Sequence, residues 1–165
     1  MPIIHGLLQE LEQEAQTTRR VLERVPGNQL AWRPHEKART LGELAYHIAT
    51  VPGNIAELAS KSPVTIPNFP ETSPKSASEL VPMLDQSIAK AKATLGGMDD
   101  AALNATFRVM RGDREIVAVP RGAFLRTVML NHWYHHRGQL STYLRTLGQP
   151  VPSIYGPSAD EDPFA

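Results

Sequence analysis

The chain has 165 residues, of which 41% are hydrophobic and 21% charged, so it can bury one core and we expect a single domain over residues 1–165. Basic and acidic residues each number 17, and this balance, together with the absence of an apolar run of roughly 20 residues, predicts binding to neither nucleic acid nor membranes. The absence of cysteine excludes disulfides, thiolate metal ligands and a cysteine nucleophile, and it is compatible with the cytoplasmic location that we expect.

The first predicted helix covers residues 3–25. Its apolar side chains recur in steps typical of one helix face, and Pro26-Gly27-Asn28 ends it. The N-terminal stretch MPIIHGLLQELEQE has no basic segment and turns acidic within ten residues, so we expect no signal peptide. The predicted apolar face consists of Ile4, Leu7, Leu8, Leu11, Ala15, Leu22 and Val25.

The second predicted helix covers residues 40–60. Thr40 and Glu43 stand three residues apart at its start, a spacing typical of a capping box. Pro52 lies inside the helix and cannot donate to the carbonyl of Ile48, so we expect a kink rather than two separate helices. The predicted apolar stripe consists of Leu41, Leu44, Ile48, Val51, Ile55 and Leu58.

The middle of the chain is predicted to form a long loop, a helix and a β-hairpin in turn. Residues 60–77 are rich in proline and serine and predict a long loop. A third helix follows from about Leu80 to Gly96-Gly97, and residues 105–119 then alternate polar and apolar side chains around the turn Arg111-Gly112-Asp113, which predicts a β-hairpin. The stripe of the third helix consists of Leu80, Leu84, Ile88, Ala91 and Leu95.

The last predicted helix covers residues 121–147, with Pro120 suited to its first turn and Gly148 to its end. Four helices of this length predict an all-α fold, a four-helix bundle with crossover connections and a small β-hairpin before the last helix. The last helix places two histidines in an otherwise apolar stripe of Leu125, Met129, His132, His136, Leu140, Tyr143 and Leu147.

His132 and His136 are four residues apart on one helix face, so their imidazoles can converge on one ion. Trp133 stands where the metalloprotease motif H-E-x-x-H has its general base. His47, at the edge of the second helix's stripe, could supply a third imidazole and leave positions open for water or substrate. It could equally be a solitary core histidine bonded to a carbonyl such as that of Ile48, and the residues alone leave both interpretations open.

Four nearby polar residues have weaker claims to a role in the site. His135 points about 100° away from His136 on the helix, toward a neighbouring helix, a dimer partner or solvent. Glu43 could accept a hydrogen bond from an imidazole, although the capping box is the simpler interpretation. For Arg137 and Gln139, which could bond substrate or a partner chain, we expect ordinary roles on the helix surface.

Three stretches, LGELAYHIA with His47, HWYHHRGQL with His132 and His136, and LRTLGQPVPSIYGPSADE, occur in an order that resembles the DinB family. The phrase LAWRPHEKARTLGEL before the first histidine also fits, so the resemblance spans nearly the whole chain. It implies a four-helix bundle, often dimeric, in which His47, His132 and His136 bind a divalent ion of zinc, nickel or iron, with water completing the shell. No substrate pocket or catalytic side chain follows from it.

Some members of the resembled family are transferases or isomerases that use a low-molecular-weight thiol, such as bacillithiol, mycothiol or glutathione. The leading hypothesis is therefore a metalloenzyme of the thiol-dependent S-transferase type, in which the thiol of a second molecule replaces the missing cysteine. One alternative is a metal-dependent hydrolase, although the sequence supplies no clear carboxylate to move the proton. The others are a non-catalytic metal-binding or stress-response homodimer and a helical bundle without an ion.

Overall fold

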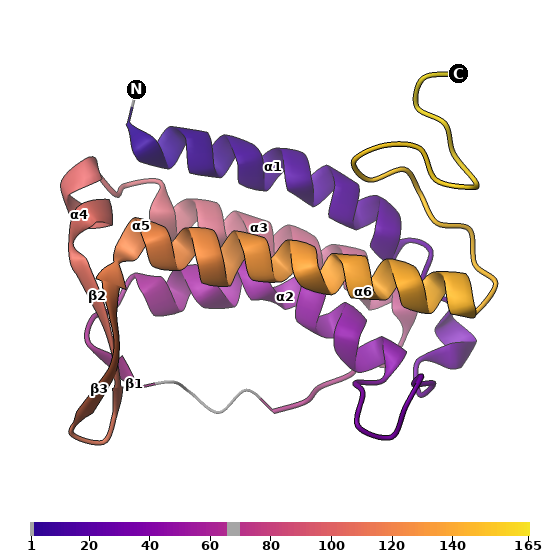
Figure 1. Ribbon diagram of the computed structural model, residues 1–165, viewed down its shortest axis with the longest axis horizontal. Coiled ribbons are helices and arrows are strands. Elements are labelled where there is room, and N and C mark those ends of the chain that lie inside the picture. Colours follow the sequence, from indigo (N-terminus) through magenta and orange to yellow (C-terminus); the bar gives the residue numbers. More distant parts are fainter. Residues whose placement is uncertain (1, 66–69) are drawn as a thin grey trace.

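The computed structural model describes residues 2–65 and 70–165, and its main feature is a bundle of four long helices (Figure 1). The predicted all-α four-helix bundle is therefore confirmed. In Figure 1, α2 and α3 run in the same direction and α1 and the C-terminal helix run in the opposite one, so the connection from α2 to α3 crosses over. The helices are α1 (Ile3–Leu22), α2 (Leu41–Ala59), α3 (Leu80–Leu95) and a C-terminal helix made of α5 (Arg121–Phe124), a π-helical segment (Leu125–Asn131) and α6 (His132–Thr146).

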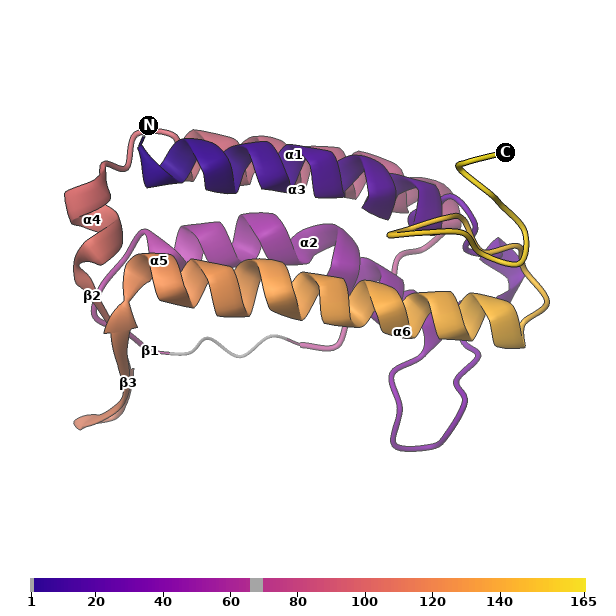
Figure 2. The ribbon, with the colours of Figure 1, turned by 45° about the horizontal axis from the view of Figure 1, so that its top comes forward.

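A small sheet closes the end of the bundle at which α5 begins (Figure 1 and Figure 2). The predicted hairpin is confirmed as β2 (Thr106–Arg111) and β3 (Arg114–Pro120), which pair in antiparallel fashion around Gly112 at φ +60°. The two-residue strand β1 (Val64–Thr65) adds a parallel neighbour to β2, and the short helix α4 (Asp100–Asn104) precedes the hairpin. Both were missed because such short elements have no measurable periodicity.

The start of α2 confirms the predicted capping box. Thr40 Oγ1 accepts a hydrogen bond from the Glu43 N–H at 3.2 Å, and Glu43 Oε2 accepts one from the Thr40 N–H at 2.7 Å. These two bonds satisfy amide groups that have no partner inside the helix. They fix the residue at which α2 begins, and His47 follows two helical turns later.

Pro52 leaves α2 a single helix, as predicted, and Figure 1 shows a bend near the middle of α2. Ser87 of α3 bonds to the backbone at this point. Its Oγ accepts from the Gly53 N–H at 2.8 Å and donates to the Thr50 carbonyl at 3.2 Å. A Cβ on Gly53 would lie 2.9 Å from the Ser87 carbonyl oxygen, so the close approach of the two helices requires glycine here.

The buried face of α6 is displaced from the predicted stripe. At three of its four positions the buried residue comes one place later in the sequence than predicted, and Leu140 is common to both. The buried face consists of Trp133, Arg137, Leu140 and Leu144, while His132 and His136 lie half-buried at its edge. The π-helical segment is the physical reason, because it adds a residue to the turn before α6 and rotates the following residues by about 100° relative to a continuous α-helix. The expectation of a surface role for Arg137 was therefore wrong, and its side chain is 1% exposed.

Within the described part of the chain, no helix combines the length and the apolar character that crossing a bilayer requires.

Candidate metal centre

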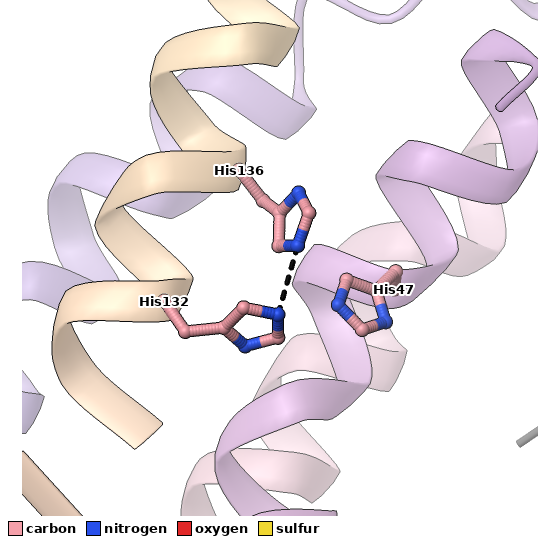
Figure 3. Close-up of side chains that lie close together, drawn as sticks. All are labelled: His47, His132 and His136. Carbon is pink, nitrogen blue, oxygen red and sulfur yellow. Dashed lines mark hydrogen bonds between the residues drawn. The ribbon is translucent and has the colours of Figure 1, made fainter. Parts of the chain in front are cut away.

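α6 brings the imidazoles of His132 and His136 together on the side that faces α2. Their Nε2 atoms lie 2.9 Å apart. Two nitrogens bonded to one zinc ion at about 2.0–2.1 Å are separated by roughly 3 Å when their bonds meet near a right angle. The separation is that of a hydrogen bond between the two rings (Figure 3), and it is also close to the separation that a shared ion needs.

His47 approaches this pair from α2 (Figure 3). Its ring centroid lies 5.1 Å from that of His132 and 4.6 Å from that of His136. One ring nitrogen from each of the three residues lies within 4.8 Å of the others, and all three side chains are half-buried. The structure thus assembles, from two helices, the three histidines that the sequence singled out.

Trp133 connects the two helices at this level. Its side chain is fully buried, and its Nε1–H donates to the Ile48 carbonyl at 2.8 Å. That carbonyl needs a partner because Pro52, four residues later, has no N–H to offer. The residue that replaces the general base of the protease motif therefore holds α6 against α2 beside the histidines.

The same bond argues against a solitary core role for His47. The Ile48 carbonyl is bonded to Trp133, and among the described residues the buried Nε2 of His47 has no hydrogen-bond partner. Nδ1 of His132 is also buried and has no hydrogen-bond partner among the described residues. A buried polar atom without a partner costs about 1–3 kcal/mol. A divalent ion would provide a partner for His47, so the donor set fits a metal.

Gln139 controls which nitrogen of His136 is available. Its Oε1 lies 2.7 Å from Nδ1 of His136 and accepts the proton of that nitrogen, which leaves a lone pair on Nε2. Groups that accept a hydrogen bond from the other ring nitrogen commonly orient metal-binding histidines. An ordinary role on the helix surface was expected for Gln139, although its position three residues after His136 was a usable signal.

The electrostatic surroundings keep the three imidazoles neutral. Burial and, to a smaller extent, the positive charge of Arg39 together lower the pKa of His47 to about 3. Burial also lowers the pKa of His136 to about 4, against the hydrogen bond to Gln139, which raises it. The pKa of His132 falls for the same first two reasons, burial and Arg39. At neutral pH all three rings retain the lone pairs that a metal ion binds.

A cavity of about 120 Å³ adjoins His47 and represents the candidate substrate pocket that the sequence could not locate. Glu43 contributes to its wall while its carboxylate stays in the capping box, as the simpler interpretation predicted. His135 is exposed and lies outside the group of converging nitrogens. The cavity is lined by Arg39, Glu43, Tyr46, His47, Thr50, Asn54 and residues 70–72.

Comparison with known proteins agrees with this architecture. The model of the DinB family matches residues 3–162. YrdA of Bacillus subtilis is 28% identical over 158 residues, which cover 93% of this chain and 89% of YrdA. The crystal structure of a DinB-like protein from Bacillus cereus superposes with a TM-score of 0.71 at 26% identity, covering 92% of this chain and 97% of that one. The DinB-like protein YjoA of Bacillus subtilis gives a TM-score of 0.69 at 18% identity, covering 90% and 96%.

Proposed function

The chain belongs to the DinB family, and from this premise we propose that it binds a divalent metal ion through His47, His132 and His136. The observation that carries the proposal is the convergence of one ring nitrogen from each of the three histidines within 4.8 Å, and it is supported by the buried Nε2 of His47, which has no partner among the described residues. Imidazole ligands suit zinc, nickel and iron, and we propose that the ion is one of these.

We further propose that the protein is an enzyme of the thiol-dependent S-transferase type. A bound divalent ion would supply a Lewis acid that lowers the pKa of a thiol at neutral pH. The chain has no cysteine, so the sulfur has to come from a second molecule. In the transfer, that sulfur forms a bond to an electrophilic carbon, the leaving group departs with its electron pair, and the thiol proton passes to solvent.

The carboxylates near the cavity favour this reaction over hydrolysis. A metal-dependent hydrolase needs a group that takes a proton from water. Glu43 lines the cavity, but its Oε2 accepts the Thr40 N–H and stabilises the start of α2. Glu71 also lines the cavity, and its carboxylate lies 3.6 Å from Arg39. Neither is bonded to a histidine among the described residues, whereas thiol transfer requires no such base.

The metal site is tested by elemental analysis of protein that is purified without an affinity tag. We expect close to one divalent ion for each wild-type chain and a large loss of metal in His47→Ala. His135→Ala is the matched control, because it removes an exposed histidine next to His136 and should leave the metal content unchanged. Wild-type stoichiometry in His47→Ala would show that the three-histidine site is wrong.

The reaction is tested by incubating metal-loaded protein with a panel of small thiols and the electrophile monochlorobimane. We expect turnover with at least one thiol, lost in His47→Ala. The same preparations are assayed with ester and amide substrates. Hydrolysis without thiol transfer would support the hydrolase instead, and inactivity in all assays would support a non-catalytic metal-binding protein.

The family resemblance also leads us to propose a homodimer. Light scattering coupled to size-exclusion chromatography should give a mass twice that of the 18.2 kDa chain. A mass equal to that of one chain across the concentration range would contradict this proposal without affecting the metal site.

A further inference from the structure

The cavity beside His47 has room for a small organic molecule. Its volume is about 120 Å³, whereas about 10–15 Å³ in the same measure holds one water. α2 forms one wall through Glu43, Tyr46 and His47, and residues 70–72 form another. Arg39, just before α2, contributes a positive charge to this wall. Because His47 belongs to both the cavity and the histidine cluster, a molecule in the cavity would lie next to the proposed ion.

Arg39 has unused capacity for hydrogen bonding. Its guanidinium carries five N–H donors. Its Nε lies 3.6 Å from Glu71 Oε1, longer than a hydrogen bond, and its side chain makes no hydrogen bond to any other described residue. Glu71 is 61% exposed, so water screens this ion pair and its contribution is small. A ligand carboxylate could therefore replace Glu71 as the partner of Arg39 at little cost.

The charges around the cavity favour an anion once a metal is bound. Three neutral imidazoles leave the double positive charge of a divalent ion uncompensated. Arg39 adds another positive charge, close enough to lower the pKa of all three histidines. Only two carboxylates line the described wall, those of Glu43 and Glu71. The net charge of these groups is thus positive when the ion is bound and negative without it. Anion binding should therefore depend on the metal.

We propose that this cavity binds a small thiol that carries a carboxylate, with the carboxylate paired to Arg39 and the sulfur directed at the three-histidine centre. The inference rests on the proposed metal site and names the substrate class for it. Arg39 is suited to this role because its two parallel N–H groups match the two oxygens of a carboxylate. Arg39 is accordingly a specificity-determining residue.

The experiment compares two thiols of equal chain length on cobalt(II)-loaded protein. These are 3-mercaptopropionate, which has a carboxylate, and 3-mercapto-1-propanol, which has none. Near-ultraviolet absorption from sulfur bound to cobalt reports binding without any turnover. We expect the wild type to bind the carboxylate thiol about tenfold more tightly, as one charge-assisted hydrogen-bonded pair provides.

Two variants locate the origin of this preference. Arg39→Gln should take up cobalt like the wild type and lose the tenfold preference, while its affinity for the uncharged thiol stays within about twofold of the wild-type value. Arg33→Gln is the matched control, because Arg33 lies in the same loop, donates to the Glu36 carbonyl and does not line the cavity. It should retain the full preference.

The possible outcomes distinguish a failure of the carboxylate site from a failure of the proposed metal site. Equal affinity for the two thiols in the wild type, or a preference that survives Arg39→Gln, would overturn the carboxylate site and leave the metal site standing. Failure of the wild type to take up cobalt would overturn the metal site and this inference together.

Discussion

α6 carries two polar clusters on adjacent residues, and they differ in how completely their atoms are paired. One is the arginine cluster, in which Arg137 faces α1. Its guanidinium donates to Glu14 Oε2 at 2.6 Å, to Thr18 Oγ1 at 3.1 Å and to the Tyr155 hydroxyl at 2.5 Å. The Tyr155 hydroxyl in turn donates to Glu14 at 2.9 Å. The rings of Tyr134 and Tyr155 lie 5.2 and 5.1 Å from the guanidinium carbon.

The histidine cluster, formed by His47 of α2 with His132 and His136 of α6, is incompletely paired. One of its buried nitrogens, Nε2 of His47, has no partner among the described residues. A buried group that is fully hydrogen-bonded holds a fold together, whereas a buried group without a partner indicates a ligand from outside the chain. The comparison thus assigns Arg137 to structure and supports the proposed metal site at the histidine cluster.

The largest effect should come from breaking the arginine cluster. Arg137→Met leaves the carboxylate of Glu14 buried without its charge partner, which costs about 3–5 kcal/mol in the free energy of unfolding. Urea unfolding measures this loss. The double variant Glu14→Gln with Arg137→Met should recover part of it, because no uncompensated charge remains. If Arg137→Met unfolded like the wild type, the cluster would not be structural.

A metal ion should produce the next largest effect, at the other cluster. Saturation at about 100 times the dissociation constant stabilises a protein by about 2.7 kcal/mol. Removal of the ion with a chelator should lower the free energy of unfolding of the wild type by about this amount. The same treatment should leave His47→Ala unchanged and should still destabilise His135→Ala. An equal response of wild type and His47→Ala would contradict a histidine-held ion.

The two clusters also differ in how far the sequence revealed them. The spacing of His132 and His136 predicted a converging pair, because four residues make about one helical turn. His47 lies far away in the sequence; its place at the edge of the second helix's stripe left a metal role and a core role open, and the order of the family motifs favoured the metal role. Arg137 was misplaced because the π-helical segment before α6 rotates the helix, and no pattern in that segment reveals the extra residue. The fold itself was accessible because its four apolar stripes are long.

Gln139 provides a smaller test of the histidine cluster. Gln139→Ala removes the acceptor that fixes the proton on Nδ1 of His136, and losses of outer partners typically weaken metal binding about 10–100-fold. Competition with a chromophoric chelator measures the affinity. Thr142→Ala is the control, since the side chain of this exposed α6 residue bonds only to the Gly138 carbonyl among the described residues. Unchanged affinity in Gln139→Ala would make the contact incidental.

The smallest effect should come from an ion pair of the same chemistry as the arginine cluster, placed at the surface. Arg126 donates to both carboxylate oxygens of Glu10 at 2.6 Å, and its side chain is 46% exposed. The Arg126 hydrogen bond holds the pKa of Glu10 below its usual value of 4.5. A lowered carboxyl pKa contributes stability that is fully present above the unfolded value and disappears as the pH falls through the folded one.

The free energies of unfolding of wild type and Glu10→Gln should therefore differ by less than about 1 kcal/mol at pH 7, and the difference should fade as the pH falls below the usual carboxyl pKa of 4.5 and through the lowered one. Urea unfolding across this pH range measures the difference. A gap that persists in acid would show that packing against Tyr134, whose hydroxyl donates to Glu10 at 2.9 Å, matters more than charge. Arg126 and Arg137 both pair with glutamates of α1, and the smaller loss expected for the exposed pair is consistent with its screening by water.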